Sequence, residues 1–202
     1  CRISRFWRSN GIELFMNIND ILIGACERRI VVPAFNAAHL PMIRPIITAL
    51  KKNNAFALVE VSRPDVEKFG ARSFREVAEE FHKHADYKYT ALHLDHVPAI
   101  DEDGKDVDWE RLIRDGISFG YNSVMIDGSR LPFEENVRIT KRVVDIAHEK
   151  GVAVEAELGA VLGHENGPMP DYEELFASGK GFTDAMQAEE FVKRTGVDWL
   201  SV

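Results

Sequence analysis

Cysteine is scarce in this chain, and long apolar runs are missing from it. The 202 residues include only two cysteines, Cys1 and Cys26, which provide neither a disulfide framework nor the spacing of a metal site. No segment approaches the roughly 20 apolar residues that a membrane-spanning helix requires. These absences favour a protein of a reducing, cytoplasmic compartment.

Positive charge is also in deficit. The chain carries 25 lysines and arginines against 33 acidic residues, a net charge of -8. A nucleic-acid-binding protein usually presents a basic face, and the basic residues here are scattered among acidic ones, so we set nucleic acid aside as a partner. A phosphorylated metabolite stays possible, because phosphate sites are built locally from backbone N–H groups and helix N-termini.

The first fifteen residues differ in character from the rest. Residues 1–15 start with basic side chains but lack the apolar core and small-residue cleavage site of a signal peptide. Met16 then opens an amphipathic run. We expect Met16 to be the natural start, residues 1–15 to be a non-native or disordered extension, and residues 16–202 to form one domain.

Short apolar runs rich in β-branched residues alternate with longer amphipathic runs, which is typical of strands alternating with helices. The predicted strands cover residues 30–35, 56–61, 89–94, 123–127, 152–158 and 198–202. The predicted helices cover residues 39–53, 71–85, 106–118, 134–150 and 184–195. Regular βα units of this kind form parallel sheets with crossover helices.

Polar side chains gather where the predicted strands end, which separates two α/β folds. A doubly wound sheet collects its ligand groups at one switch point, whereas a TIM (β/α)8 barrel takes them from several strand ends. The strand ends here carry Asn36, Ser62, Asp95, His96, Asp127, Ser129 and Glu157. We therefore predict a TIM (β/α)8 barrel. Because eight strands complete such a barrel, we expect these six to be part of a longer one.

The third predicted strand closes with His93, Leu94, Asp95 and His96. Alternation places His93 and Asp95 on one face, and Leu94 and His96 on the other, until the strand turns into its loop. An imidazole at a strand end suits Zn²⁺, and a neighbouring carboxylate can orient ligands or move protons. The alternative, in which both histidines only satisfy buried hydrogen bonds, stays open.

Carboxylates end the next two strands. Asp127 precedes Gly128, which alone is compatible with simple turn chemistry. Glu155 and Glu157 lie two residues apart in an apolar strand and so share one face. Buried acids are costly unless they are paired or bound to a metal, so this pair indicates a metal or substrate site. A solvated edge strand is the competing interpretation.

A long segment rich in glycine and proline follows, from Gly163 to Gly181. Such loops are often lids or binding segments. Glu165 is a candidate base that lid closure would deliver, and an incidental acid on a surface loop is the alternative.

Five motifs in order carry a family resemblance. PAFNAAH, HLDH, SVMIDGSRLPFEEN, VEAELG and TGVDWLSV resemble consecutive signatures of the class II, zinc-dependent fructose-bisphosphate aldolases, a family that includes tagatose-bisphosphate and related ketose-bisphosphate aldolases. The resemblance runs from Met16 to Val202. It implies a zinc-dependent aldehyde-lyase of carbohydrate metabolism and glycolysis that reversibly cleaves fructose 1,6-bisphosphate to dihydroxyacetone phosphate and an aldehyde such as glyceraldehyde 3-phosphate.

The resemblance also implies a role for individual residues. His96 would bind zinc, and Asp127 and Glu157 would support or alternately bind it. Asp95 would handle the hydroxyl proton during carbon–carbon cleavage, and Glu165 would exchange a proton at the dihydroxyacetone-phosphate carbon. The substrate contacts would be Asn36 and, near the distal phosphate, Ser62. A monovalent cation as a second cofactor and a homodimer or homotetramer are further implications.

Two departures from the family bear on these expectations. Residues 63–74 are more charged than the family's Gly-rich stretch, and the lid differs from the family's usual GGxED. The family also takes two further zinc histidines from beyond its sixth strand, so we expect residues 1–202 alone to be inactive. The alternatives are a non-catalytic aldolase-like subunit or remnant, and another metal-dependent barrel enzyme, such as a hydrolase with water as nucleophile.

Overall fold

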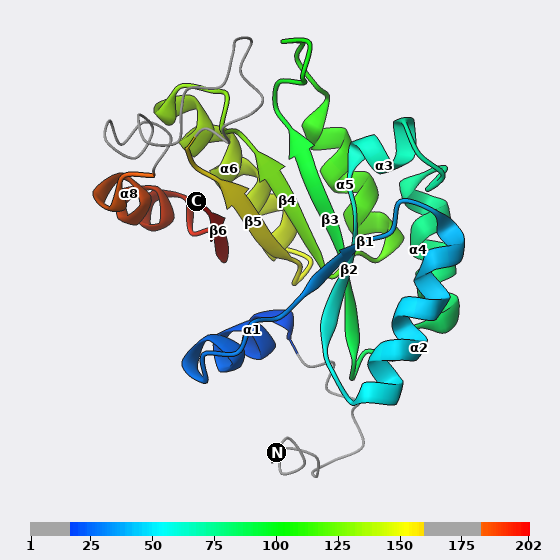
Figure 1. Cartoon of the computed structure of the whole chain (residues 1–202). Coiled ribbons are helices and arrows are strands. Elements are labelled where there is room, and N and C mark those ends of the chain that lie inside the picture. Colours follow the sequence, from blue (N-terminus) through cyan, green and yellow to red (C-terminus); the bar gives the residue numbers. More distant parts are fainter. Residues whose placement is uncertain (1–16, 160–182) are drawn as a thin grey trace, which may run out of the picture.

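A computed structural model of the chain describes residues 17–159 and 183–202. Its centre is a six-stranded, entirely parallel sheet in the order β1-β2-β3-β4-β5-β6 (Figure 1). The strands are β1 (Ala34–Asn36), β2 (Ala57–Val61), β3 (Thr90–Pro98), β4 (Ser123–Asp127), β5 (Ala153–Glu157) and β6 (Trp199–Ser201). Spatial order equal to chain order is the singly wound arrangement of a barrel, so the predicted partial TIM barrel is confirmed and the doubly wound alternative is not.

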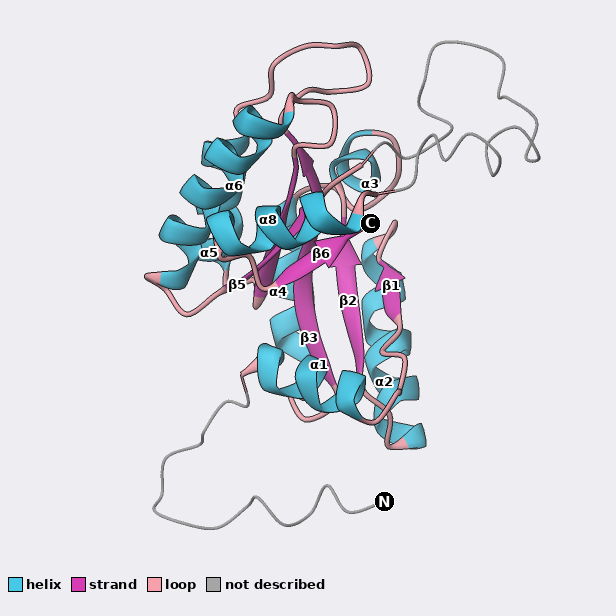
Figure 2. Ribbon diagram, turned by 90° about the vertical axis from the view of Figure 1, so that its left-hand side faces the viewer, coloured by secondary structure: helices cyan, strands magenta, loops and turns pink. Residues whose placement is uncertain are grey.

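Most of the described helices cover the outer face of this half-barrel, whereas α1 lies at the amino-terminal end of its interior (Figures 1 and 2). They are α1 (Ile18–Glu27), α2 (Ile43–Asn53) after a 3-10 turn (Leu40–Met42), α3 (Arg63–Glu67), α4 (Phe74–His84), α5 (Trp109–Phe119), α6 (Phe133–His148) and α8 (Ala185–Thr195). Side-chain caps begin several of them. Asp108 accepts a hydrogen bond from the backbone of Arg111 at the start of α5, and Gly120 ends that helix at φ 88°, where a side chain would be strained. None of the described helices is long and apolar enough to cross a membrane.

Alternation along the strands divides the side chains between two environments. Val59, Leu92, Val124 and Val154 face outward, and all four are completely buried against the helices. The inward-facing residues at the amino-terminal ends of β2, β3 and β5 are apolar, and Ile18 of α1 packs against them. Toward the carboxyl-terminal ends the inward-facing residues become polar, so the interior changes from an apolar floor to an acidic mouth.

Three local features differ from the sequence-based prediction. β1 begins after Pro33 rather than at residue 30, since proline has no N–H to donate to a ladder. β3 continues to Pro98, four residues past its predicted end. The short helix α3 was not predicted, although Ser62 and Asp65 have the spacing of an N-terminal cap, and both the Ser62 N–H and its hydroxyl donate to Asp65 Oδ2 at 2.8 Å.

The outer interface should dominate stability. Phe81 of α4 is fully buried, whereas Phe69 is 59% exposed. Phe81→Ala should therefore lower the free energy of unfolding by about 3–5 kcal/mol, because it leaves a cavity between α4 and the sheet. Urea unfolding followed by circular dichroism measures the change. The matched variant Phe69→Ala should change it by less than about 0.5 kcal/mol, and equal effects would contradict the assigned packing.

Candidate metal centre

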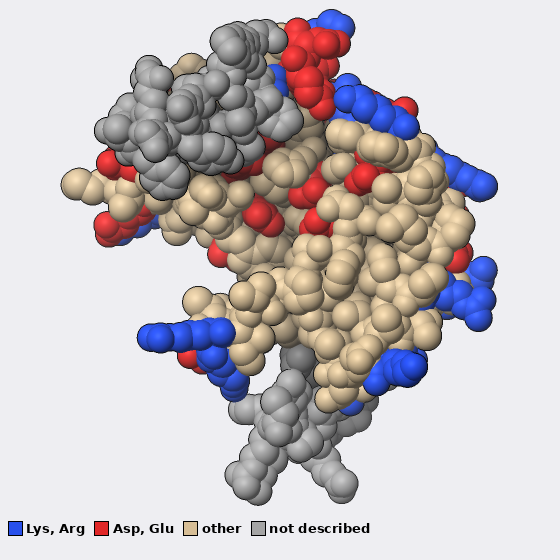
Figure 3. Space-filling view, in the orientation of Figure 1, with Lys and Arg blue, Asp and Glu red and all other residues tan. Residues whose placement is uncertain are grey.

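Three side chains from three strands converge at the carboxyl end of the half-barrel. His96 Nδ1 lies 3.6 Å from Asp127 Oδ2 and 3.5 Å from Glu157 Oε2, and the three ligand atoms form one compact group. Ligand atoms held tetrahedrally at zinc distances lie roughly 3.3–3.6 Å apart. In Figure 3 acidic side chains line the hollow at the centre of this face. The spacing therefore fits a divalent cation.

His96 reaches this group because β3 contains a bulge. The register shifts between Leu94, which pairs with Val124, and Val97, which pairs with Ile126. The extra residue breaks the alternation, and His96 adopts φ 40°. Strict alternation would have placed His96 on the face opposite Asp95, whereas the bulge brings both side chains to the barrel mouth. Bulges and positive φ values of this kind are common beside active sites.

The charges at this centre are poorly balanced. The carboxylate of Asp127, followed by the charges of Asp95 and Glu157, raises the pKa of His96 to about 9. Burial, followed by the charge of Asp127, raises the pKa of Glu157 to about 7. Glu157 Oε2 is buried and has no hydrogen-bond partner among the described residues. A carboxylate oxygen without a hydrogen-bond partner, facing an imidazole nitrogen, is a combination of ligand atoms that zinc sites use.

Asp127 is held in place by the turn that follows it. Its Oδ1 accepts hydrogen bonds from the Ser129 N–H at 3.0 Å and from the Ser129 hydroxyl at 2.6 Å. Burial by itself would raise the pKa of Asp127, but the contacts with His96 and Ser129 together lower it. Asp127 therefore stays ionised with Oδ2 directed at His96.

Asn136 of α6 supports the same centre from behind. Its Nδ2 donates to the backbone oxygen of Glu157 at 2.9 Å, and its Oδ1 accepts from the Thr140 hydroxyl at 3.1 Å. A Cβ added at Gly128 would lie 2.1 Å from Asn136 Oδ1, so only glycine fits there. Asn136 thus ties the end of β5 to α6 and packs closely against the turn after β4, an arrangement that the sequence analysis missed.

Asp95 lies beside the three ligands. Its Oδ1 is 3.9 Å from His96 Nε2, and its Oδ2 is 3.4 Å from Asn36 Nδ2. Burial is the main cause that raises the pKa of Asp95 above its ordinary value. Asn36 Nδ2 is also 3.4 Å from Asp65 Oδ2, the carboxylate that Ser62 contacts. The structure therefore brings Asn36, Asp95 and Ser62 to one side of the mouth.

A second polar group lies deeper in the interior; the sequence analysis singled out its His93 and Glu155 as candidates but not its Glu60. It contains Glu60, His93 and Glu155, which alternation turns inward with Leu58, Ala91 and Ala153. Burial lowers the pKa of His93 to about 3. Burial, followed by the charge of Asp95, raises the pKa of both Glu60 and Glu155 to about 7. The alternating apolar residues of β2 were the signal that could have placed Glu60 here.

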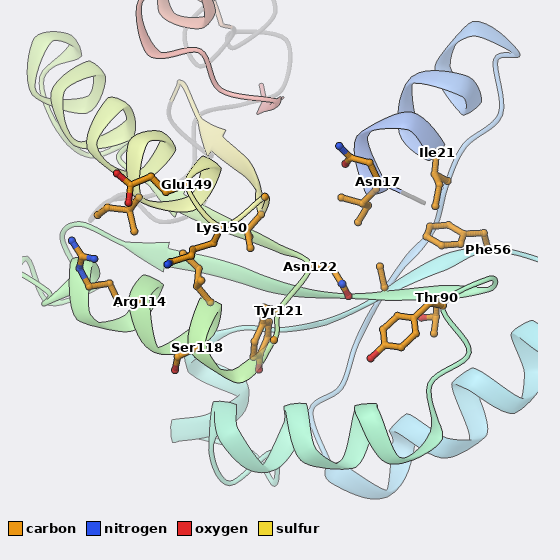
Figure 4. Close-up of a pocket in the computed structure, with 18 residues that line it drawn as sticks. Asn17, Ile21, Phe56, Thr90, Arg114, Ser118, Tyr121, Asn122, Glu149 and Lys150 are labelled. Carbon is orange, nitrogen blue, oxygen red and sulfur yellow. The ribbon is translucent and has the colours of Figure 1, made fainter. Parts of the chain in front are cut away.

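Glu165 falls within residues 160–182, outside the described residues. A cavity of about 670 Å³ lies at the amino-terminal ends of the strands, lined among others by Phe56, Thr90 and Tyr121 (Figure 4). In (β/α) barrels the chemistry occurs at the opposite, carboxyl-terminal end, where the carboxylates converge.

Comparison with known proteins agrees with this geometry. The family model described as "Fructose-bisphosphate aldolase class-II" matches residues 16–202. The fructose-bisphosphate aldolase of Staphylococcus aureus (strain Mu50) is 33% identical over 188 residues, which are 92% of this chain and 60% of that protein. The relative from Geobacillus stearothermophilus is 43% identical over 111 residues, 55% of this chain and 33% of that protein.

Solved structures show the same likeness. The YdjI aldolase from Escherichia coli K12 is 30% identical, with a TM-score of 0.67 and coverage of 91% of this chain and 62% of that one. The fructose-bisphosphate aldolase of Campylobacter jejuni, with a TM-score of 0.68 over 91% of this chain and 55% of that one, is 22% identical and shares the fold alone. The chain spans about three fifths of the length of the S. aureus relative.

In the metal-free protein the pKa values of the two histidines of β3 should be shifted in opposite directions from the ordinary value of about 6.5. Because the pKa of His96 is raised to about 9, its stabilising contribution is complete below pH 6.5 and is lost as the pH rises through about 9. His93 should remain neutral down to about pH 3. Histidine-ring NMR resonances followed against pH measure both midpoints. Asp127→Asn should move the His96 midpoint down toward 6.5, and two unshifted midpoints near 6.5 would refute the assignment.

Removing the Asn136 side chain should weaken metal binding without removing a ligand. Asn136→Ala leaves the Glu157 carbonyl without its donor, so we expect a loss of about 1–3 kcal/mol in stability and a roughly 10–100-fold weaker affinity for Zn²⁺. Isothermal titration calorimetry measures the affinity. The control is Asn122→Ala, which removes a 2.8 Å hydrogen bond to the Leu92 N–H at the other end of the sheet and should leave the affinity unchanged. If the two variants lost Zn²⁺ affinity equally, Asn136 would have only a structural role.

Proposed function

Because the chain belongs to the class II fructose-bisphosphate aldolase family, we propose that its protein is a metal-dependent aldehyde-lyase acting on a ketose bisphosphate. Fructose 1,6-bisphosphate is the first candidate substrate, and dihydroxyacetone phosphate and an aldehyde such as glyceraldehyde 3-phosphate are the expected products. The observation that carries this proposal is the convergence of His96, Asp127 and Glu157 beside the partly buried Asp95.

His96, Asp127 and Glu157 are the residues proposed to hold the metal. Zn²⁺, when bound, supplies a Lewis acid that polarises the ketone and stabilises the negative charge that develops on cleavage. The fit rests on the spacing of the ligand atoms and on the unpartnered Glu157 Oε2. We propose zinc over magnesium because an imidazole is among the ligands.

Asp95 is the proposed acid/base. Burial raises its pKa, which makes its carboxylate a stronger base than a solvated aspartate. In the cleavage direction Asp95 removes the proton of the hydroxyl group next to the breaking carbon–carbon bond. Asn36 Nδ2, 3.4 Å from Asp95 Oδ2, helps to orient that carboxylate. We further propose Asn36 and Ser62 as substrate contacts, and Glu165 as the group that returns a proton to carbon.

The assembly and cellular setting also belong to this proposal. We propose a homodimer or homotetramer in the cytoplasm that works in carbohydrate metabolism, and membership of the aldolase family supports this. A monovalent cation is proposed as a second cofactor on the family resemblance alone.

Turnover of fructose 1,6-bisphosphate by the protein encoded by the natural gene tests the proposal. Asp95→Asn should lower kcat by about 10²–10⁴-fold, the usual contribution of a general base, in a coupled assay of dihydroxyacetone phosphate release. Removal of the metal by a chelator should abolish activity, and added Zn²⁺ should restore it. The control Asp145→Asn removes the same charge from the exposed face of α6 and should leave kcat unchanged.

Two outcomes would count against this function. Full turnover by Asp95→Asn and by Glu165→Gln would refute the assigned proton transfers. Release of inorganic phosphate without an aldehyde product would favour a metal-dependent hydrolase instead.

A further inference from the structure

The segment that follows β3 forms a closed loop above the mouth, and we name it the β3 loop (residues 99–108). In Figure 1 it rises from the carboxyl end of β3 and leads into α5. Ile100 and Asp106 pair as an isolated antiparallel bridge, and the Val107 N–H donates to the Ala99 oxygen at 3.0 Å. The loop therefore has a defined backbone shape.

Asp101 fixes that shape from inside the loop. Its side chain is buried, and its Oδ1 accepts hydrogen bonds from the backbone N–H groups of Asp103 at 3.0 Å and of Lys105 at 2.8 Å. The Asp101 N–H donates in turn to the Lys105 oxygen at 2.9 Å. An aspartate that accepts from the backbone two residues further on is a common device for closing a turn. The loop is therefore organised around this one carboxylate.

Two arginines connect Asp101 to the neighbouring strand ends. Arg130, three residues after Asp127, donates from Nη1 to the Asp101 backbone oxygen at 2.9 Å. Arg63, the first residue of α3, has Nη2 3.7 Å from Asp101 Oδ2. Asp101 therefore joins the segments that follow β2, β3 and β4.

The β3 loop begins three residues after His96, whose φ of 40° is a conformation that persists only where the surroundings enforce it. Before the bulge, pairing with β2 and β4 fixes the chain as far as Leu94. After the bulge, the register resumes at Val97, and the Ala99 N–H donates to the Asp127 oxygen at 2.8 Å. His96 is thus held between two anchors, and the second anchor ends in the β3 loop.

We propose that Asp101 is a positioning residue for His96. By closing the β3 loop and joining it to both arginines, Asp101 keeps His96 in the conformation that presents its imidazole to the other two ligands. None of the hydrogen bonds and ion pairs of Asp101 described above reaches those ligands, so it acts through the backbone that carries His96. That His96 binds a metal rests on the proposed function, whereas the hold of the loop on the bulge does not.

Hydrogen exchange in the metal-free protein encoded by the natural gene tests the hold of the loop without metal or activity. Asp101→Ala should speed exchange of the Ala99 N–H roughly tenfold, as expected when a net hydrogen bond is lost. Asp101→Asn keeps the Oδ1 acceptor and should restore most of the protection. The matched control Asp103→Ala removes an exposed carboxylate of the same loop and should behave as the wild type. NMR measures the exchange of this amide.

Zn²⁺ affinity, measured by isothermal titration calorimetry on the same proteins, tests whether the loop acts on the metal centre. Asp101→Ala should weaken binding about 10–100-fold, the usual cost of removing a contact behind the ligands, and Asp101→Asn should stay close to the wild type. Arg130→Ala removes only the outer link of the loop and should weaken binding in the same direction. It keeps the test decisive if circular dichroism shows that Asp101→Ala does not fold.

Faster exchange at Ala99 together with weaker Zn²⁺ binding supports the inference. Unchanged exchange at Ala99 in Asp101→Ala overturns it, and so does an unchanged Zn²⁺ affinity in a variant whose exchange is faster. A wild-type protein that binds no Zn²⁺, but whose Ala99 exchange depends on Asp101, would refute the proposed metal centre and still support the hold of Asp101 on the His96 bulge.

Discussion

The parallel pairing of six strands in chain order is the constraint on which the rest of the structure depends. It brings all strand carboxyl ends to one rim, and it gives every strand an outer and an inner face. The outer face is apolar and carries the packing with the helices. The inner face is thereby free to hold groups that contribute little to stability, and its residues near the rim are acidic.

That acidic interior creates an electrostatic conflict within the fold. Glu60, Asp95, Glu155 and Glu157 are largely removed from water, and His96 is their nearest cationic group among the described residues. The conflict appears as raised carboxyl pKa values and as a buried Glu157 oxygen without a partner. A bound cation resolves it, which is why the same residues are poor for stability alone and well suited to metal chemistry.

Residues that do not themselves bind the metal hold the proposed ligands in position at the rim. Asn136 clamps the end of β5, Gly128 leaves room for that clamp, and Ser129 occupies one oxygen of Asp127. The Ser129 contacts leave Asp127 Oδ2 directed at the metal position, and the Asn136 contact fixes the backbone that carries the Glu157 side chain. Strand ends anchored on both sides keep the ligand atoms close to coordination distance, and a flexible loop would not.

Local sequence patterns were sufficient for the architecture and for part of the site. Alternation of apolar runs determined the order of strands and helices, and a two-residue spacing placed Glu155 and Glu157 on one face. The polar strand ends determined that Asp95, Asp127 and Glu157 would meet at one rim, because parallel strands end together.

The tertiary structure decided the rest. The bulge that turns His96 inward depends on its register with β4, the entry of Glu60 depends on the pairing of β2 with β3, and the Asn136 clamp joins residues far apart in the chain. Such pairings form only when distant segments are packed together, so no local pattern encodes them.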